Sequence, residues 1–196
     1  MALIAADLER VRRRNNLQRR APERTLYRTV TIPAGTASVD TGAVFPVRTG
    51  ALVLATAIHI TGGSAAGIVW EFGDNTTGAK LAISGGSLFL AAGAASGDAG
   101  VDLEIEADAF AASGYRASLV VELNPGRGRA IVTINGSRAG RVVSPDPWAS
   151  WASSNAGAVG AAHAGSASTQ RGQAINGAPS QFALTAPLSV CMGQSL

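Results

Sequence analysis

From Leu26 onward, apolar and polar residues alternate with a period of two in short runs that end at turn-forming residues. This period is typical of a half-buried β-strand, whereas an amphipathic helix repeats its apolar residues every three or four positions. Asn135-Gly136 stands between two such runs and indicates a tight hairpin, because both turn positions need a positive φ. The ranges that we expect to be strands are 26–32, 38–45, 51–61, 67–72, 79–83, 87–91, 101–107, 117–123, 130–134, 138–143 and 181–191. About eleven short strands without helices between them predict an antiparallel two-sheet sandwich of the jelly-roll type.

The first 25 residues differ from this pattern in both charge and period. Residues 1–28 hold eight arginines against three carboxylates, whereas the remainder of the chain is mildly acidic. Apolar side chains at helical spacing predict an amphipathic helix whose stripe is too thin to keep it folded alone in water. The side chains that we expect to anchor this arm to a partner are Leu3, Ile4, Leu8, Val11, Arg10, Arg12, Arg13, Arg14, Arg19 and Arg20.

Three kinds of partner suit a basic arm: nucleic acid, an anionic membrane and an acidic protein socket. No aromatic residue interleaves the arginines before Tyr27, which disfavours recognition of single-stranded nucleic acid by stacking. The apolar stripe is small for a membrane surface. We therefore expect a protein socket in a larger assembly, with an anchoring arm over 1–25 and a jelly-roll domain over 26–196.

Composition excludes several other classes of protein. Cys191 is the single cysteine, so an intramolecular disulfide and a cysteine-based metal cage are excluded. His59 and His163 each lack a second histidine at ligand spacing, so we expect no metal and no cofactor. No apolar run is long enough to span a bilayer, and the charges follow the first apolar stretch instead of preceding it, unlike a secretory signal. We expect synthesis in a bacterial cytoplasm.

Three neighbouring pieces carry a family resemblance. They are Ile68–Asp74 (IVWEFGD), the hairpin of 79–83 and 87–90 about Gly85-Gly86, and the strand pair 118–123 and 130–136, which ends at Ile134-Asn135-Gly136. Their order resembles the concanavalin A-like lectin/glucanase jelly roll, especially its laminin-G-like and pentraxin-like branches. The resemblance covers roughly residues 50–145 plus the closing strand. Calcium-dependent members hold the ion with clustered Asp and Asn, for which Asp74-Asn75 is the nearest counterpart, although a turn-capping role explains both residues.

An acidic strand is the sharpest candidate for chemistry. Alternation over 101–108 places apolar residues on one face and four carboxylates on the other. Retaining glycosidases of the family that the chain resembles carry a strand reading E-x-D-x-E, in which paired carboxylates act as nucleophile and general acid/base. Here the candidates are Asp102, Glu104 and Glu106, with a shorter side chain at the nucleophile position and Glu in the middle. These departures, and the lack of nearby aromatic residues, favour a solvated acidic face and no enzyme.

Trp148 and Trp151 open a long stretch, 149–180, that is rich in Ala, Gly, Ser and Asn. We expect this stretch to be a loop. The two rings have three alternatives: they plug the end of the sandwich, seat a neighbouring subunit, or stack on a sugar.

These features favour a non-enzymatic structural or adhesion subunit of a virion or phage-like particle, such as a head decoration, spike or tail fibre. The arm would anchor it, the lectin-like body would be displayed, and the chain would form a homo-oligomer. The alternatives are a carbohydrate-binding module or lectin for a host-surface glycan, and a jelly-roll glycoside hydrolase.

Overall fold

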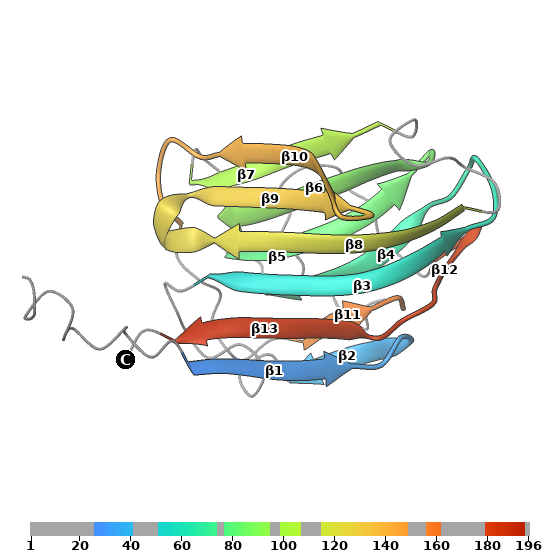
Figure 1. Cartoon of the computed structure of the whole chain (residues 1–196), viewed down its shortest axis with the longest axis horizontal. Helices are drawn as coiled ribbons and strands as arrows, with labels where there is room; N and C mark the ends of the chain where they lie inside the picture. The colour runs from blue at the N-terminus through green and yellow to red at the C-terminus, as the bar shows by residue number, and fades with distance from the viewer. Residues whose placement is uncertain are drawn as a thin grey trace, which may run out of the picture.

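The computed structural model describes residues 26–40, 51–73, 77–94, 99–106, 115–148, 156–161 and 179–194. In these ranges the chain forms two antiparallel sheets packed face to face (Figure 1). The strands are β1 (Leu26–Ile32), β2 (Thr36–Asp40), β3 (Leu52–Ile60), β4 (Gly67–Gly73), β5 (Thr77–Ser84), β6 (Ser87–Ala94), β7 (Gly100–Ile105), β8 (Tyr115–Asn124), β9 (Arg129–Ile134), β10 (Ser137–Val143), β11 (Ala156–Val159), β12 (Phe182–Leu184) and β13 (Leu188–Gln194). A short 3-10 helix, η2 (Pro125–Arg127), joins β8 to β9. The predicted two-sheet sandwich of the jelly-roll type is confirmed.

The larger sheet has the strand order β1-β13-β3-β8-β9-β10, with β12 also paired to β3, and the smaller has the order β2-β11-β4-β5-β6-β7. The edge strands β7 and β10 contact each other across one side of the sandwich. There Leu103 packs so closely on Gly140 that a Cβ on that glycine would lie 2.7 Å from the Leu103 Cδ2 atom. The strands β1 and β2 lie at the opposite side (Figure 1).

The hydrophobic core fills the space between the sheets and follows from the alternation of the strands. Strand β3 alternates strictly between buried and half-buried residues, and β9 does the same. From the smaller sheet, Trp70 and Phe72 stack on each other with ring centroids 5.8 Å apart. A bulge between Ile68 and Trp70 lets this strand keep its large aromatic residues in the core.

The predicted turns form as their residues require. Asn135 and Gly136 have φ values of 50° and 81° and close the two-residue hairpin between β9 and β10. Gly85 and Gly86 do the same between β5 and β6, with φ values of 57° and 85°. In η2 the Asn124 side chain accepts a hydrogen bond from the Arg127 backbone N–H and so caps the turn.

Two predicted elements are wrong, beyond shifts of one to three residues at the ends of other strands within the described ranges. Residues 156–159, expected within a loop, form strand β11 between β2 and β4. Its small residues carry no apolar signal, and Gly157 has to be small because a Cβ there would lie 2.4 Å from the Phe72 Cδ1 atom. The single strand expected over 181–191 is divided into β12 and β13, whose registers against β3 differ by two residues; Pro187, which has no N–H to donate, lies between them.

Several expectations fall on residues outside the described ranges. They concern the helical arm and its arginines within 1–25, the Asp74-Asn75 turn, Trp151 and His163. Among the residues that the structure does describe, no helix is long and apolar enough to cross a membrane.

Candidate functional site

The outer face of the smaller sheet collects the side chains that carry chemistry. Strand register places them in rows across β4 to β7, and directly opposed residues of antiparallel strands share a face. One row consists of Glu71, Lys80, Ala91 and Asp102, and the next of Ala82, Phe89 and Glu104. A cation, an aromatic ring and three carboxylates are therefore neighbours on one face.

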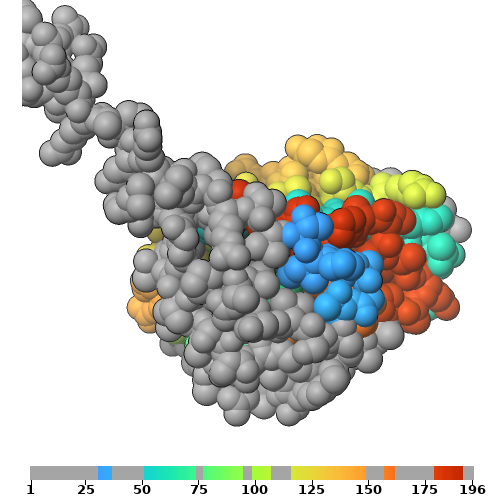
Figure 2. Space-filling view, turned by 90° about the horizontal axis from the view of Figure 1, so that it is seen from below, coloured from blue at the N-terminus to red at the C-terminus, as the bar shows by residue number. Residues whose placement is uncertain are grey.

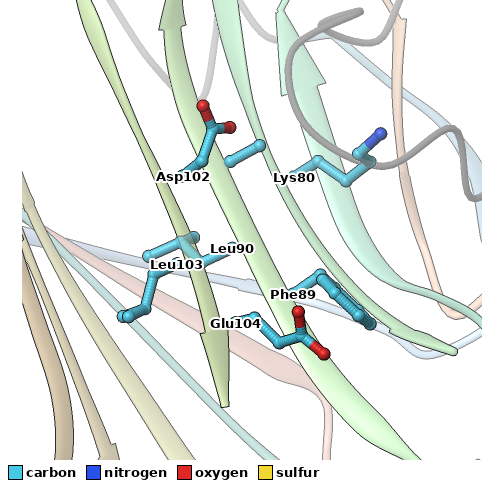
Figure 3. A pocket seen from close by; sticks show the side chains of 7 residues that line it. Lys80, Phe89, Leu90, Asp102, Leu103 and Glu104 are labelled. Carbon is cyan, nitrogen blue, oxygen red and sulfur yellow. The ribbon is translucent and has the colours of Figure 1, made fainter. Parts of the chain in front are cut away.

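A groove of about 440 Å³ lies over β5, β6 and β7. It is lined by Lys80, Phe89, Leu90, Ala91, Asp102, Leu103 and Glu104. Figure 3 shows the Glu104 carboxylate beside the ring of Phe89, its partner in the register, whereas Leu103 points away from both. The groove thus has an apolar ring and carboxylate oxygens within reach of the same ligand.

Exposure increases across the first row toward the edge of the sheet. Glu71 and Lys80 are 2% and 3% exposed, although they lie on the face opposite the core. Asp102 and Glu104 on β7 are exposed, and Phe89 is half-buried. A ligand in this groove would therefore meet solvent on the β7 side.

The buried charges of this row are unevenly matched. Burial lowers the pKa of Lys80, and attraction from Glu71 and then Asp102 opposes that effect. The Oε2 atom of Glu71 is buried and accepts no hydrogen bond in the structure. A buried carboxylate oxygen without a donor is costly, so this row holds negative charge that hydrogen bonds do not fully compensate.

The two sheets carry opposite charge. Strands β4 to β7 of the smaller sheet, with the residue that follows them, hold Lys80 against four carboxylates: Glu71, Asp102, Glu104 and Glu106. Strands β8 to β10 and the turn η2 hold five arginines against Glu122 alone: Arg116, Arg127, Arg129, Arg138 and Arg141. On the edge strand β10, a bulge and two of these arginines also discourage pairing with another sheet edge.

A row of glycines borders the groove face. Gly73, Gly78, Gly93 and Gly100 oppose one another across β4 to β7, two residues along each strand from the row of Lys80. A Cβ on Gly93, whose φ is +128°, would lie 2.3 Å from the Cα atom of Gly100. The strands approach too closely here for any side chain, so this end of the face is flat backbone.

The structure brings together only part of the predicted site. Asp102 and Glu104 line the groove; Glu106 is exposed just after β7 and does not. Trp148 is 4% exposed and belongs to the hydrophobic core, which matches the packing alternative, and its Nε1 atom has no hydrogen-bond partner. In the described part of the chain, no group of three His, Cys, Asp or Glu side chains is arranged to hold a metal ion.

Sequence reasoning missed Lys80, Phe89 and Glu71 as site residues. Each lies in a predicted strand at a position whose neighbours along the chain belong to the core. The signal was a lone lysine within an apolar strand and a phenylalanine out of phase with Leu88 and Leu90. Only strand register brings them to the acidic strand.

Comparison with known proteins reveals similarity in fold. No family model and no curated protein matches the chain. The Ruminococcus gnavus IT-sialidase CBM40 is 9% identical with a TM-score of 0.54, covering 87% of this chain and 93% of that one. The same module bound to alpha2,6 sialyllactose is 9% identical with a TM-score of 0.53, covering 84% of this chain and 90% of that one. The NanB sialidase from Streptococcus pneumoniae is 8% identical with a TM-score of 0.56, and the match covers 84% of this chain but 26% of that one. The chain therefore shares the β-sandwich fold of a carbohydrate-binding module.

Proposed function

We propose that this chain is a lectin-like carbohydrate-binding domain whose glycan lies in the groove over β5 to β7. The observation that carries the proposal is the half-buried ring of Phe89 directly opposite the exposed carboxylate of Glu104. A ring offers a flat apolar surface to the C–H face of a sugar, and carboxylate oxygens accept hydrogen bonds from hydroxyls. The fold of a carbohydrate-binding module supports the same proposal.

The proposed activity is binding without hydrolysis. A general acid for glycoside cleavage is held in apolar surroundings, as in the enzymes that pair two carboxyl groups about the scissile bond. Asp102, Glu104 and Glu106 are all exposed, and β7 is the edge strand of its sheet. We therefore assign Asp102 and Glu104 to ligand contact.

The experiment is a glycan-array screen followed by calorimetric titration of the best ligand into the wild type and Phe89→Ala. The matched control is Val143→Ala, which removes a side chain 53% exposed on β10 of the other sheet. We expect Phe89→Ala to weaken binding by about 5- to 150-fold, which corresponds to the loss of roughly 1–3 kcal/mol of stacking and apolar contact, and we expect Val143→Ala to leave binding unchanged. Full affinity in Phe89→Ala, with an unchanged thermal midpoint, would place the glycan elsewhere.

The wider role, an oligomeric adhesion subunit held on a virion or phage-like particle by residues 1–25, stays a prediction. It is compatible with glycan binding, because a displayed lectin-like domain can attach a particle to a host surface.

A further inference from the structure

We infer that the groove selects amino sugars that carry a positive charge, in preference to N-acetylated sugars and sialylated glycans. The inference rests on the proposed glycan-binding function and specifies its ligand class. It departs from the ligand of the similar module, which is bound to alpha2,6 sialyllactose.

The first argument is that the groove offers no exposed cation to an anionic sugar. Lys80 is the single basic residue lining it, and that side chain is 3% exposed. Lys80 is attracted to carboxylates on both sides, Glu71 on β4 and Asp102 on β7. An anionic sugar entering at β7 would meet the exposed carboxylates of Asp102 and Glu104 before it met the ammonium group, so like-charge repulsion disfavours it.

The second argument is that the negative charge of this face is in surplus and poorly screened. Glu71, Asp102, Glu104 and Glu106 stand against one lysine on β4 to β7 and the residue that follows. The unpartnered Oε2 atom of Glu71 is buried, so solvent screens its field less than that of a surface group. A ligand ammonium group in the groove therefore gains attraction from both the exposed and the buried carboxylates.

The third argument separates an amino sugar from a basic peptide. Glu104 is opposed by the Phe89 ring, and the next residue of that row is the buried Ala82. A pyranose places an apolar C–H face and an equatorial amine at a fixed distance, which suits a ring beside a carboxylate. A lysine-rich peptide would meet the charge but would make little use of the ring.

The test is calorimetric titration at slightly acidic pH with four probes: a β-1,4-linked glucosamine trimer, its N-acetylated counterpart, sialyllactose and trilysine. We expect the glucosamine trimer to bind roughly five- to tenfold more tightly than the acetylated trimer, as two exposed charge contacts allow. The preference should shrink at high salt, because exposed charges are screened. Sialyllactose and trilysine should bind more weakly than either trimer.

Variants separate this inference from the proposed function. The double variant Asp102→Asn/Glu104→Gln should remove the preference, because it weakens binding of the glucosamine trimer more than binding of the acetylated trimer, and it should also remove the salt dependence of that preference. Glu122→Gln, an exposed carboxylate on β8 of the other sheet, is the matched control and should change neither. Equal binding of both trimers, tighter binding of sialyllactose, or trilysine binding that survives Phe89→Ala would overturn the inference. In each of these cases, glycan binding in the groove would still stand if Phe89→Ala weakened the binding of sugars. If no sugar bound in a Phe89-dependent way, the proposed function and the inference would fail together.

Discussion

Replacing Lys80 by Met should destabilise the protein far more than replacing it together with its neighbour Glu71. The two residues are register partners on β5 and β4 and are 3% and 2% exposed. Without the ammonium group, the Glu71 carboxylate is left buried with one oxygen already lacking a hydrogen-bond donor. Removing one partner of a buried charge pair costs about 3–5 kcal/mol, whereas replacing both by apolar groups of similar volume is often neutral or stabilising.

The two single variants should also differ from each other. Lys80 is attracted to two carboxylates, so in Glu71→Met it keeps Asp102 as a counter-charge. We expect Glu71→Met to cost about 1–3 kcal/mol, close to the penalty of one imperfectly satisfied buried group. The double variant Glu71→Met/Lys80→Met should fall within about 1 kcal/mol of the wild type, which gives a coupling energy above about 2 kcal/mol.

Urea unfolding followed by tryptophan fluorescence measures these differences, because urea, unlike guanidinium chloride, leaves ionic strength low. The cost of Lys80→Met corresponds to a fall of about 6–20 °C in thermal midpoint for a chain of this size. Glu104→Gln is the exposed control and should stay within about 0.5 kcal/mol of the wild type. Additive effects of the two single variants, within about 0.5 kcal/mol, would refute electrostatic coupling across this row.

Three further predictions follow from the same structure. Gly93→Ala should lower the free energy of unfolding in urea by about 2–5 kcal/mol, because a Cβ there strains a positive φ and overlaps Gly100. The control Gly85→Ala has open space around it and should cost only about 1–2 kcal/mol, so equal costs would contradict this explanation. Burial lowers the pKa of Lys80 from 10.5 in the folded protein. At a pH between this lowered pKa and 10.5, the unfolded chain therefore binds more protons than the folded protein. Wild-type stability relative to the Met/Met double variant should therefore rise as pH rises toward 10.5, and a fall would show the sign to be wrong. Deleting residues 1–24 should leave the thermal midpoint within a few degrees of the wild type, because the described strands close both sheets without them; an unfolded product would assign the arm to the core.

The alternation of apolar residues was sufficient to predict the fold because one face of most strands is buried and the other is not. In β3 and β9 this difference is complete, and their bounds differ from the prediction by one residue at most. The signal weakens where both faces are buried, as in β4, because a continuous apolar run does not show which residues face the core. It vanishes in β11, where close approach to Phe72 requires glycine and the partners of the strand lie far away in the sequence.

The site was harder to predict than the fold because it is created by register. The acidic strand was visible as Asp102 and Glu104, and both line the groove. Phe89 and Lys80 join them only because β6 and β7 pair Phe89 with Glu104 and because β5 brings Lys80 two strands away from Asp102. A slip of one residue in either hairpin would turn these side chains to the other face, and no local pattern in the sequence reports such a slip.

The position of the groove bears on how a tethered domain would present it. Strand β1 pairs with β13 so that Leu26 opposes Gln194, and both ends of the described chain leave from this edge of the larger sheet (Figure 1). Seen from below, the turn between β1 and β2 lies against the C-terminal strands on this same side (Figure 2). The groove lies over β5 to β7 of the smaller sheet, near the edge where β7 meets β10, and β10 lies five strand spacings or roughly 24 Å from β1 across the larger sheet. A domain held through its N-terminus would therefore turn the groove away from its attachment.

Fusing a bulky folded tag before Leu26 should leave the affinity for sugar unchanged, whereas the same tag inserted at the β9–β10 hairpin, beside the groove edge, should weaken it. Loss of affinity with the N-terminal tag alone would show that the groove faces its attachment.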